Sequence, residues 1–205
     1  MFPPGMAGWH DDALEPLSYD PEAAKAALAD AGWELNSDGV LERDGTPMEI
    51  EILTYPDRPE LPLVAAVLEQ AFAAVGAKPV INSTNFSEIP AKHNDGTLST
   101  ALFARNFALV PDPVGTLLQD YAPGGDWGAM GWVNETFTSQ VKAMAAGTAP
   151  DGTREELVAT LQAELPVLPI AWYQLNMAVS DEVDGVVVDP FERTLGLSRV
   201  TWAGE

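Results

Sequence analysis

The hydrophobic residues of the chain recur at helical spacing in several stretches, and the first of these has signals at both ends. Asp20 is a favourable capping residue, and Pro21 stands at the first helical position after it. Alanine and leucine then repeat along one face until Gly32, a residue type that commonly ends a helix. Residues 20–32 are therefore predicted to form a helix.

A strand, a helix and a second strand are predicted next. Residues 48–54 are predicted to form a strand, because apolar residues at 48, 50 and 52 alternate with Glu49 and Glu51, as a strand with one buried face requires. Apolar residues then recur at helical spacing over residues 61–75 up to Gly76, and an apolar strand follows at residues 78–82. This order is typical of a right-handed parallel crossover.

Shorter elements surround this crossover. Turn dipeptides at residues 38–39 and 44–45 flank residues 40–43 and indicate a hairpin. A weaker helix is predicted over residues 87–94. After a further turn, residues 98–107 are predicted to form another strand of the same sheet.

The second half of the chain carries three further helix signals. Asp112 is followed directly by Pro113, a cap and first-turn pair for a helix that continues to residue 121. Asn134 is a suitable cap for the next helix. Thr153 and Glu156 have the spacing of a capping box, which predicts the start of the third helix.

The remaining segments are predicted to be loop and strand. Residues 122–133 contain five glycines and prolines and are interpreted as a mobile loop. Residues 170–180 are apolar and aromatic and are predicted to form a strand, and residues 185–188 another. The order of elements indicates an α/β or α+β domain, with a mixed sheet flanked by helices.

Composition and charge exclude several classes of partner. The 205 residues include 31 acids, 10 bases and no cysteine, which gives a net charge of −21. Because phosphate binding requires a basic surface, nucleic acids and anionic membranes are excluded as partners. The acids are dispersed along the chain, so we interpret them as a solvated surface, and we hypothesise a high-salt source in which counterions screen their repulsion.

The sequence has no recognisable catalytic motif. It lacks the nucleophile elbow, the phosphate-binding and dinucleotide-binding glycine loops, and the zinc-protease motif. His10 and His93 are its only histidines, and neither has a second ligand at metal-binding spacing. Neighbouring carboxylates fall on segments that we expect to be exposed. We therefore expect a protein that is not an enzyme, with no cofactor and no metal site of its own.

Arg105 is the residue that most needs a partner. It is the only lysine or arginine between Lys92 and Lys142, and it follows an apolar run. A buried guanidinium without a compensating charge costs several kcal/mol, so a carboxylate or another anion must be supplied. The two candidates are Asp112 and an external ligand at the carboxyl edge of the sheet. Asp112 also has a structural interpretation as a helix cap.

Four stretches, in this order along the chain, resemble a known family. They are YDPEAAKAALADAGWELNSDGVLERDGTPMEIEILT, AAVLEQAFAAVGAKPVI, RNFALVPDP and TREELVATLQAELPVLPIAWYQLNMAVSDEV. Together they resemble the C-terminal half of the extracellular solute-binding proteins of peptide and nickel ABC importers, often called family 5. The resemblance spans essentially the whole chain.

The resemblance implies one lobe of a two-lobed, periplasmic-binding-protein-like α/β fold that closes around its ligand. It implies a linker at residues 1–19, a C-terminal ligand-binding lobe at residues 20–182, and a segment at residues 183–205 that returns towards an N-terminal lobe. That tail is expected to be poorly ordered or to pack against another molecule. The function implied is capture of a small peptide or of a nickel or other metal chelate for an ABC importer. The alternative is a peptide-binding domain of the same fold used in signalling or assembly.

The resemblance also implies partners and a location. The partners are the N-terminal lobe of the same full-length protein, the ABC permease subunits and the ligand. Family members are about twice this length or more and carry a signal peptide and often a lipidated cysteine. The start of this chain lacks the features of a signal peptide. We therefore expect a piece of an extracellular or periplasmic protein that is membrane-anchored in its full-length form.

The site residues are carried over one by one. Nickel-type members have an arginine and, two residues later, a ligand-facing tryptophan ahead of an Asp-Pro pair. Arg105 and Phe107 occupy these places with Asn106 between them, so the resemblance implies that this stretch binds ligand, with Arg105 clamping an anionic group. Trp172 and Tyr173 are expected to pack against the ligand.

Two further positions refine this expectation. Asp112, the acid of the Asp-Pro pair, is expected to be a structural residue near the site. Dipeptide-type members have an acid where this chain has Leu109, and use it to hold the peptide's ammonium group. Its absence favours a ligand with an anionic group, such as a metal chelate or a longer peptide held by its backbone.

Overall fold

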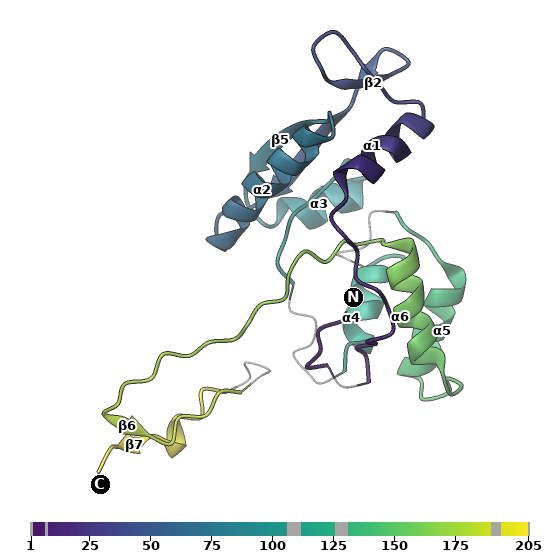
Figure 1. Cartoon of the computed structure of the whole chain (residues 1–205). Helices are drawn as coiled ribbons and strands as arrows, with labels where there is room; N and C mark the ends of the chain where they lie inside the picture. The colour runs from purple at the N-terminus through teal and green to yellow at the C-terminus, as the bar shows by residue number, and fades with distance from the viewer. Residues whose placement is uncertain (1, 7, 106–111, 126–130, 190–193, 205) are drawn as a thin grey trace. The chain divides into compact units, whose positions relative to one another are not determined.

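The computed structural model describes the chain except for residues 1, 7, 106–111, 126–130, 190–193 and 205 (Figure 1). The chain divides into two compact units, each described here by itself. Unit 1 consists of Met1–Leu14, Asn106–Ala122 and Asn134–Glu205, and unit 2 consists of Glu15–Arg105 and Pro123–Val133. The expected domain boundaries at residues 19 and 182 stay a prediction.

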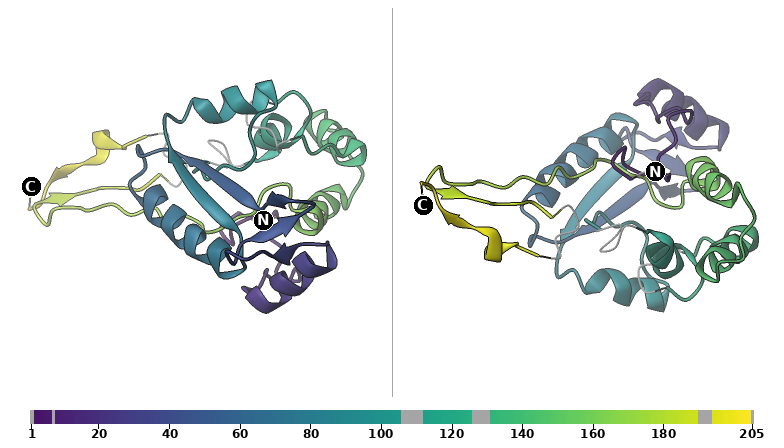
Figure 2. Two further views of the ribbon diagram at one scale, coloured as in Figure 1. Left: turned by 90° about the horizontal axis from the view of Figure 1, so that it is seen from above. Right: turned by 90° about the horizontal axis from the view of Figure 1, so that it is seen from below.

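Unit 2 contains the predicted strand, helix and strand. β4 (Glu49–Thr54) and β5 (Lys78–Ser83) pair in parallel, from Glu49 opposite Lys78 to Thr54 opposite Ser83. α2 (Glu60–Ala74) connects them, and α3 (Glu88–Asp95) follows. Figure 2 shows α2 on one side of the strand pair and α3 on the other. The parallel crossover and both helices are confirmed.

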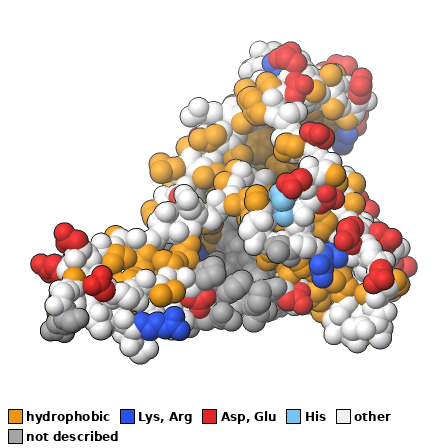
Figure 3. All heavy atoms as spheres, turned by 60° about the horizontal axis from the view of Figure 1, so that its bottom comes forward, with side chains coloured by type: hydrophobic (Ala, Val, Ile, Leu, Met, Phe, Trp, Pro, Cys, Tyr) orange, Lys and Arg blue, Asp and Glu red, His pale blue; other side chains and the backbone are white. Residues whose placement is uncertain are grey.

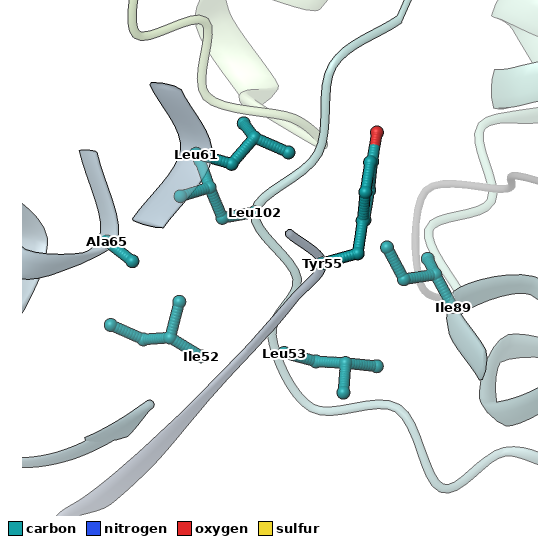
Figure 4. Close-up of a cluster of buried hydrophobic side chains, with 7 residues drawn as sticks. All are labelled: Ile52, Leu53, Tyr55, Leu61, Ala65, Ile89 and Leu102. Atoms are coloured by element: carbon teal, nitrogen blue, oxygen red, sulfur yellow. The ribbon is translucent and has the colours of Figure 1, made fainter. Parts of the chain in front are cut away.

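The burial of β4 differs from the predicted alternation. Ile52, Leu53 and Thr54 are all 1% exposed or less, so the end of the strand is buried on both faces. Figure 4 shows the cause: Ile52 points to the side of α2, while Leu53 points to the other side with Ile89 of α3. Burying side chains of this size contributes roughly 1.5–3 kcal/mol each. The helix on the second face makes this end of β4 the centre of the core of unit 2.

The start of unit 2 forms a helix and a small antiparallel sheet. α1 (Pro21–Asp30) is capped as predicted, because Asp20 Oδ1 accepts a hydrogen bond from the Ala23 amide at 2.9 Å. β1 (Glu34–Leu35), β2 (Leu41–Arg43) and β3 (Thr46–Pro47) pair in sequence order. The predicted hairpin is therefore confirmed, with β2 as the middle strand of three.

The strand expected at residues 98–107 is reduced to one parallel bridge, between Leu53 of β4 and Ala101. The Leu53 amide donates to the Thr100 carbonyl at 3.1 Å, and the Leu102 amide donates to the Leu53 carbonyl at 2.8 Å. Residues 102–105 then leave the sheet, so the prediction of a continuous strand is wrong over the described part of this segment.

Unit 1 is built on three helices: α4 (Val114–Tyr121), α5 (Glu135–Ala145) and α6 (Thr153–Glu164). Asn134 Oδ1 accepts from the Phe137 amide at 2.9 Å, which confirms the predicted cap of α5. The irregular N-terminal segment belongs to this unit and contributes the buried rings of Phe2 and Trp9. The core side chains with 1% exposure or less are Leu117, Phe137, Val141, Leu157 and Leu161.

The capping box predicted for α6 is wrong. Gly152 is the residue before the helix, and the Thr153 hydroxyl donates to the Pro150 carbonyl at 2.8 Å. Because Thr153 is itself the first helical residue, its side chain closes the preceding turn and does not cap the helix.

The strands predicted at residues 170–180 and 185–188 are also wrong. Residues 170–180 have no regular secondary structure, and each of them is exposed. The strand nearest to residues 185–188 is β6 (Val183–Asp184), which pairs with β7 (Thr201–Trp202) beyond the short 3-10 helix η1 (Leu197–Arg199). An apolar sequence supplies the faces of a strand, but the element also needs a backbone partner, which no described residue provides to residues 170–180.

The surface is strongly acidic, as the composition requires. On the face shown in Figure 3, acidic side chains lie in several separate places and basic side chains are few. Among the helices that the structure describes, none has the length and hydropathy that a membrane span requires.

Candidate functional site

The candidate site lies at the carboxyl edge of the parallel strands of unit 2. β4 ends at Thr54 and β5 at Ser83, and this edge is where open α/β sheets usually bind ligands. The Thr84 amide donates to the Thr54 carbonyl at 2.8 Å and extends the pairing by one residue. The segment that leads to Arg105 leaves the sheet at the same edge.

Tyr55, directly after β4, anchors the segment that leads to Arg105 through hydrogen bonds. Its hydroxyl accepts a hydrogen bond from the Ala104 amide at 3.2 Å and donates to the Ala104 carbonyl at 3.4 Å. The side chain is buried with 6% exposure, and its neighbours in the core include Ile89 and Leu102 (Figure 4). The backbone one residue before Arg105 is therefore anchored by a tyrosine 49 positions away.

Phe86 adds an exposed ring to the same edge. Its ring lies edge-on to Tyr55 with centroids 6.2 Å apart, and Phe86 is 48% exposed. The loop that carries it is fixed by Asn85, whose Oδ1 accepts hydrogen bonds from the Ser87 amide at 3.0 Å and the Ser87 hydroxyl at 2.8 Å. An aromatic ring held in this way offers a flat surface to a ligand.

Thr54 contributes an unsatisfied polar group below this edge. Its hydroxyl is buried and has no hydrogen-bond partner among the described residues. Such a group costs about 1–3 kcal/mol.

Tyr55, Phe86 and Thr54 were missed by sequence reasoning. The available signal was positional, because each residue stands at or just after the end of a predicted strand in a parallel unit.

Of the predicted ligand-binding residues, Arg105 is half-buried at the end of the described part of its segment in unit 2. Asn106 and Phe107 lie outside the described residues. Asp112 lies in unit 1, and its Oδ1 accepts from the Val114 amide at 2.9 Å at the start of α4. Because Pro113 is the residue before α4, Asp112 holds the turn that precedes the helix and is not itself the predicted cap. An ion pair between Arg105 and Asp112 stays a prediction.

Trp172 and Tyr173 lie in the extended segment of unit 1. They are 43% and 60% exposed, so each has ring surface available to another molecule. Their contact with a ligand stays a prediction.

His10 takes a structural place near the N-terminus. His10 Nδ1 lies 2.7 Å from the Phe2 carbonyl oxygen, and Nε2 lies 2.9 Å from Asp12 Oδ1. The Phe2 carbonyl raises the pKa of His10, burial opposes it, and the Asp12 carboxylate raises it further. Within the described ranges, no group of three or more His, Cys, Asp or Glu side chains is arranged to hold a metal ion.

The arrangement at this edge is suited to non-covalent binding. It combines a half-buried guanidinium at Arg105, an exposed ring at Phe86 and a rigidly held backbone at Ala104. A guanidinium recognises carboxylate or another anion through charge-assisted hydrogen bonds.

Comparisons with known proteins agree on one class of molecule. The sequence model described as "Bacterial extracellular solute-binding proteins, family 5 Middle" matches residues 1–128. The chain is 23% identical to the nickel-binding periplasmic protein of Escherichia coli (strain K12), over 91% of this chain and 37% of that protein. It is 28% identical to the dipeptide-binding protein of the same strain, over 93% of this chain and 35% of that protein.

A solved structure has a similar fold. The fold is similar to that of NikZ from Campylobacter jejuni in complex with Ni(L-His), with a TM-score of 0.65 and 17% identity over 79% of this chain and 34% of that one. The chain thus spans little more than a third of the length of the curated relatives that it matches.

Proposed function

The chain belongs to the bacterial extracellular solute-binding proteins of family 5, and on this premise we propose that it is part of the substrate-binding component of an ABC importer. Its fold is that of a periplasmic-binding-protein-like lobe. In the proposed mechanism this lobe and an N-terminal lobe of the same protein close around a small ligand. The ABC permease subunits receive the loaded protein.

The proposed ligand class rests on Arg105, which follows the segment at the carboxyl edge of the sheet. The backbone of the preceding residue, Ala104, is anchored by Tyr55. A half-buried guanidinium there favours a ligand with an anionic group. A nickel or other metal chelate has such a group, and so does a peptide through its carboxylate. Asn106, Phe107, Trp172 and Tyr173 are proposed to contact the rest of the ligand.

Replacement of Arg105 tests this role. Arg105→Ala is expected to weaken binding by roughly 2–5 kcal/mol if the guanidinium pairs with a desolvated anion. The measurement is calorimetric titration with Ni²⁺ and L-histidine, and separately with trialanine. Arg43→Ala is the matched control, because the Arg43 guanidinium packs over the Trp33 ring at 4.7 Å in the antiparallel sheet of unit 2. Unchanged affinity together with reduced stability would assign Arg105 to an internal pair with Asp112.

We further propose an extracellular or periplasmic location, with a membrane anchor in the full-length protein, as for other members of the family. The family consists of solute-binding proteins, and we propose no catalytic activity. The alternative is a peptide-binding domain of this fold that serves signalling or assembly. Permease and ATPase genes next to the gene for this chain would favour the importer, and their absence would favour the alternative.

A further inference from the structure

The hydrogen bonds between β4 and the segment that leads to Arg105 change from main chain to side chain at Tyr55. Up to that point the bonds of Leu53 to Thr100 and Leu102 follow an ordinary parallel ladder. If the ladder continued in this register, the Tyr55 amide would donate to the Leu102 carbonyl, and the Ala104 amide would then donate to the Tyr55 carbonyl.

The tyrosine side chain takes over this bond. The Ala104 amide donates to the Tyr55 hydroxyl at 3.2 Å, and the hydroxyl donates back to the Ala104 carbonyl at 3.4 Å. The amide and the carbonyl of Ala104 therefore both have a hydrogen-bond partner, the hydroxyl of Tyr55. Ala104 can thus lie outside the ladder without an unpaired main-chain group.

The ring that makes these bonds is itself fixed. Tyr55 is 6% exposed, packs edge-on to Phe86 and belongs to the core cluster with Leu53 and Ile89. Pro56 follows it, and a residue before proline is restricted to extended conformations. These contacts fix the position of the hydroxyl. Because the hydroxyl binds the backbone of Ala104, it also fixes the position of the adjacent Arg105 backbone.

We propose that Tyr55 is a positioning residue for Arg105, which it holds at the carboxyl edge of the sheet by binding the backbone of Ala104 through its hydroxyl. This inference rests on the proposed role of Arg105 in ligand binding. Tyr55 itself has no contact with ligand in this scheme.

The first test needs no ligand. Tyr55→Phe keeps the ring and removes the hydroxyl, while Tyr19→Phe makes the same change at an exposed tyrosine. In Tyr55→Phe the Ala104 amide is expected to exchange with solvent roughly 3- to 10-fold faster, the effect of losing one hydrogen bond. The Leu102 amide, which is bonded to Leu53, is the internal control and keeps its rate. The Arg105 Nε–Hε signal in the NMR spectrum is expected to shift in Tyr55→Phe and to stay in place in Tyr19→Phe.

The second test is a double-mutant cycle with Ni²⁺ and L-histidine, and with trialanine, as probes. Tyr55→Phe is expected to weaken binding roughly 3- to 10-fold in the natural sequence and to have no effect in an Arg105→Ala background. Equal losses in both backgrounds would show that Tyr55 supports the fold only, and would overturn the inference.

The two tests separate this inference from the proposed function. If neither probe binds the natural protein, the proposed ligand class is wrong. The NMR comparison then tests the positioning role of Tyr55 by itself. An unchanged Ala104 exchange rate or an unmoved Arg105 signal in Tyr55→Phe then overturns the positioning role, whereas changes in both support it.

Discussion

His10 is placed so that both of its ring nitrogens face hydrogen-bond acceptors. One acceptor is the Phe2 carbonyl and the other is the Asp12 carboxylate. A neutral imidazole has only one N–H, so both bonds form fully only when the ring is protonated. The hydrogen bond to Phe2 is the main reason that the pKa of His10 lies above its ordinary value of 6.5.

The pH dependence of stability follows from this direction. A pKa raised in the folded state contributes stability that is fully present below the unfolded value and is lost as the pH rises through the folded value. The thermal midpoint is therefore expected to fall between about pH 6 and 8, the range in which histidine titrates. His10→Gln should flatten this dependence, and NMR titration should place the His10 midpoint above 6.5. A His10 midpoint at or below that value would contradict the prediction.

At the level of the helix, α1 and α5 are capped by the same kind of hydrogen bond but differ in how much of each helix is buried. Asp20 and Asn134 each accept a hydrogen bond at 2.9 Å from the third helical amide. α1 has no buried residue, whereas α5 buries Phe137 and Val141. Asn134 also donates to Glu164 at the end of α6 at 2.8 Å. The α5 cap is therefore coupled to the core of its unit, and the α1 cap is not.

Removing the two caps should show this difference. Asn134→Ala is expected to lower the free energy of unfolding by about 1 kcal/mol, the usual cost of a lost cap. Asp20→Ala should have a smaller effect on unfolding and should mainly speed amide exchange in the first turn of α1. Urea denaturation and hydrogen exchange measure the two quantities. Equal losses of unfolding free energy would show that α1 is as strongly coupled to a core as α5.

At the scale of the whole molecule, charge is the dominant feature. A net charge of −21 destabilises a compact state through repulsion among the carboxylates, and salt screens that repulsion. An exposed ion pair such as Lys78–Glu49, at 2.8 Å, offsets little of this repulsion.

We therefore expect the thermal midpoint to rise with sodium chloride between about 0.01 and 0.15 M, where the Debye length falls from about 30 to about 8 Å. Each kcal/mol gained corresponds to a rise of roughly 2–4 °C for a chain of this size. Calorimetry at fixed pH measures the effect. A midpoint that does not change with salt would mean that the acidic groups are already far enough apart, and would remove the case for a high-salt adaptation.

Elements whose signals are local could be predicted from the amino-acid sequence. The caps at Asp20 and Asn134, and the crossover whose helix ends before Gly76, depend on residues a few positions apart. Period and residue type therefore suffice to predict them. The resemblance to family 5 also came from the sequence. Local signals were misleading at Thr153, where the hydroxyl closes a turn before the helix.

Features that depend on residues far apart in the chain could be found only in the folded structure. Leu53 is fully buried because α3 covers the second face of β4, and residues 170–180 remain outside any strand although they are apolar. The bond between Tyr55 and Ala104 joins residues 49 positions apart. No repeating pattern in the sequence signals a hydrogen bond of this kind, because the bond depends on where two segments meet in space.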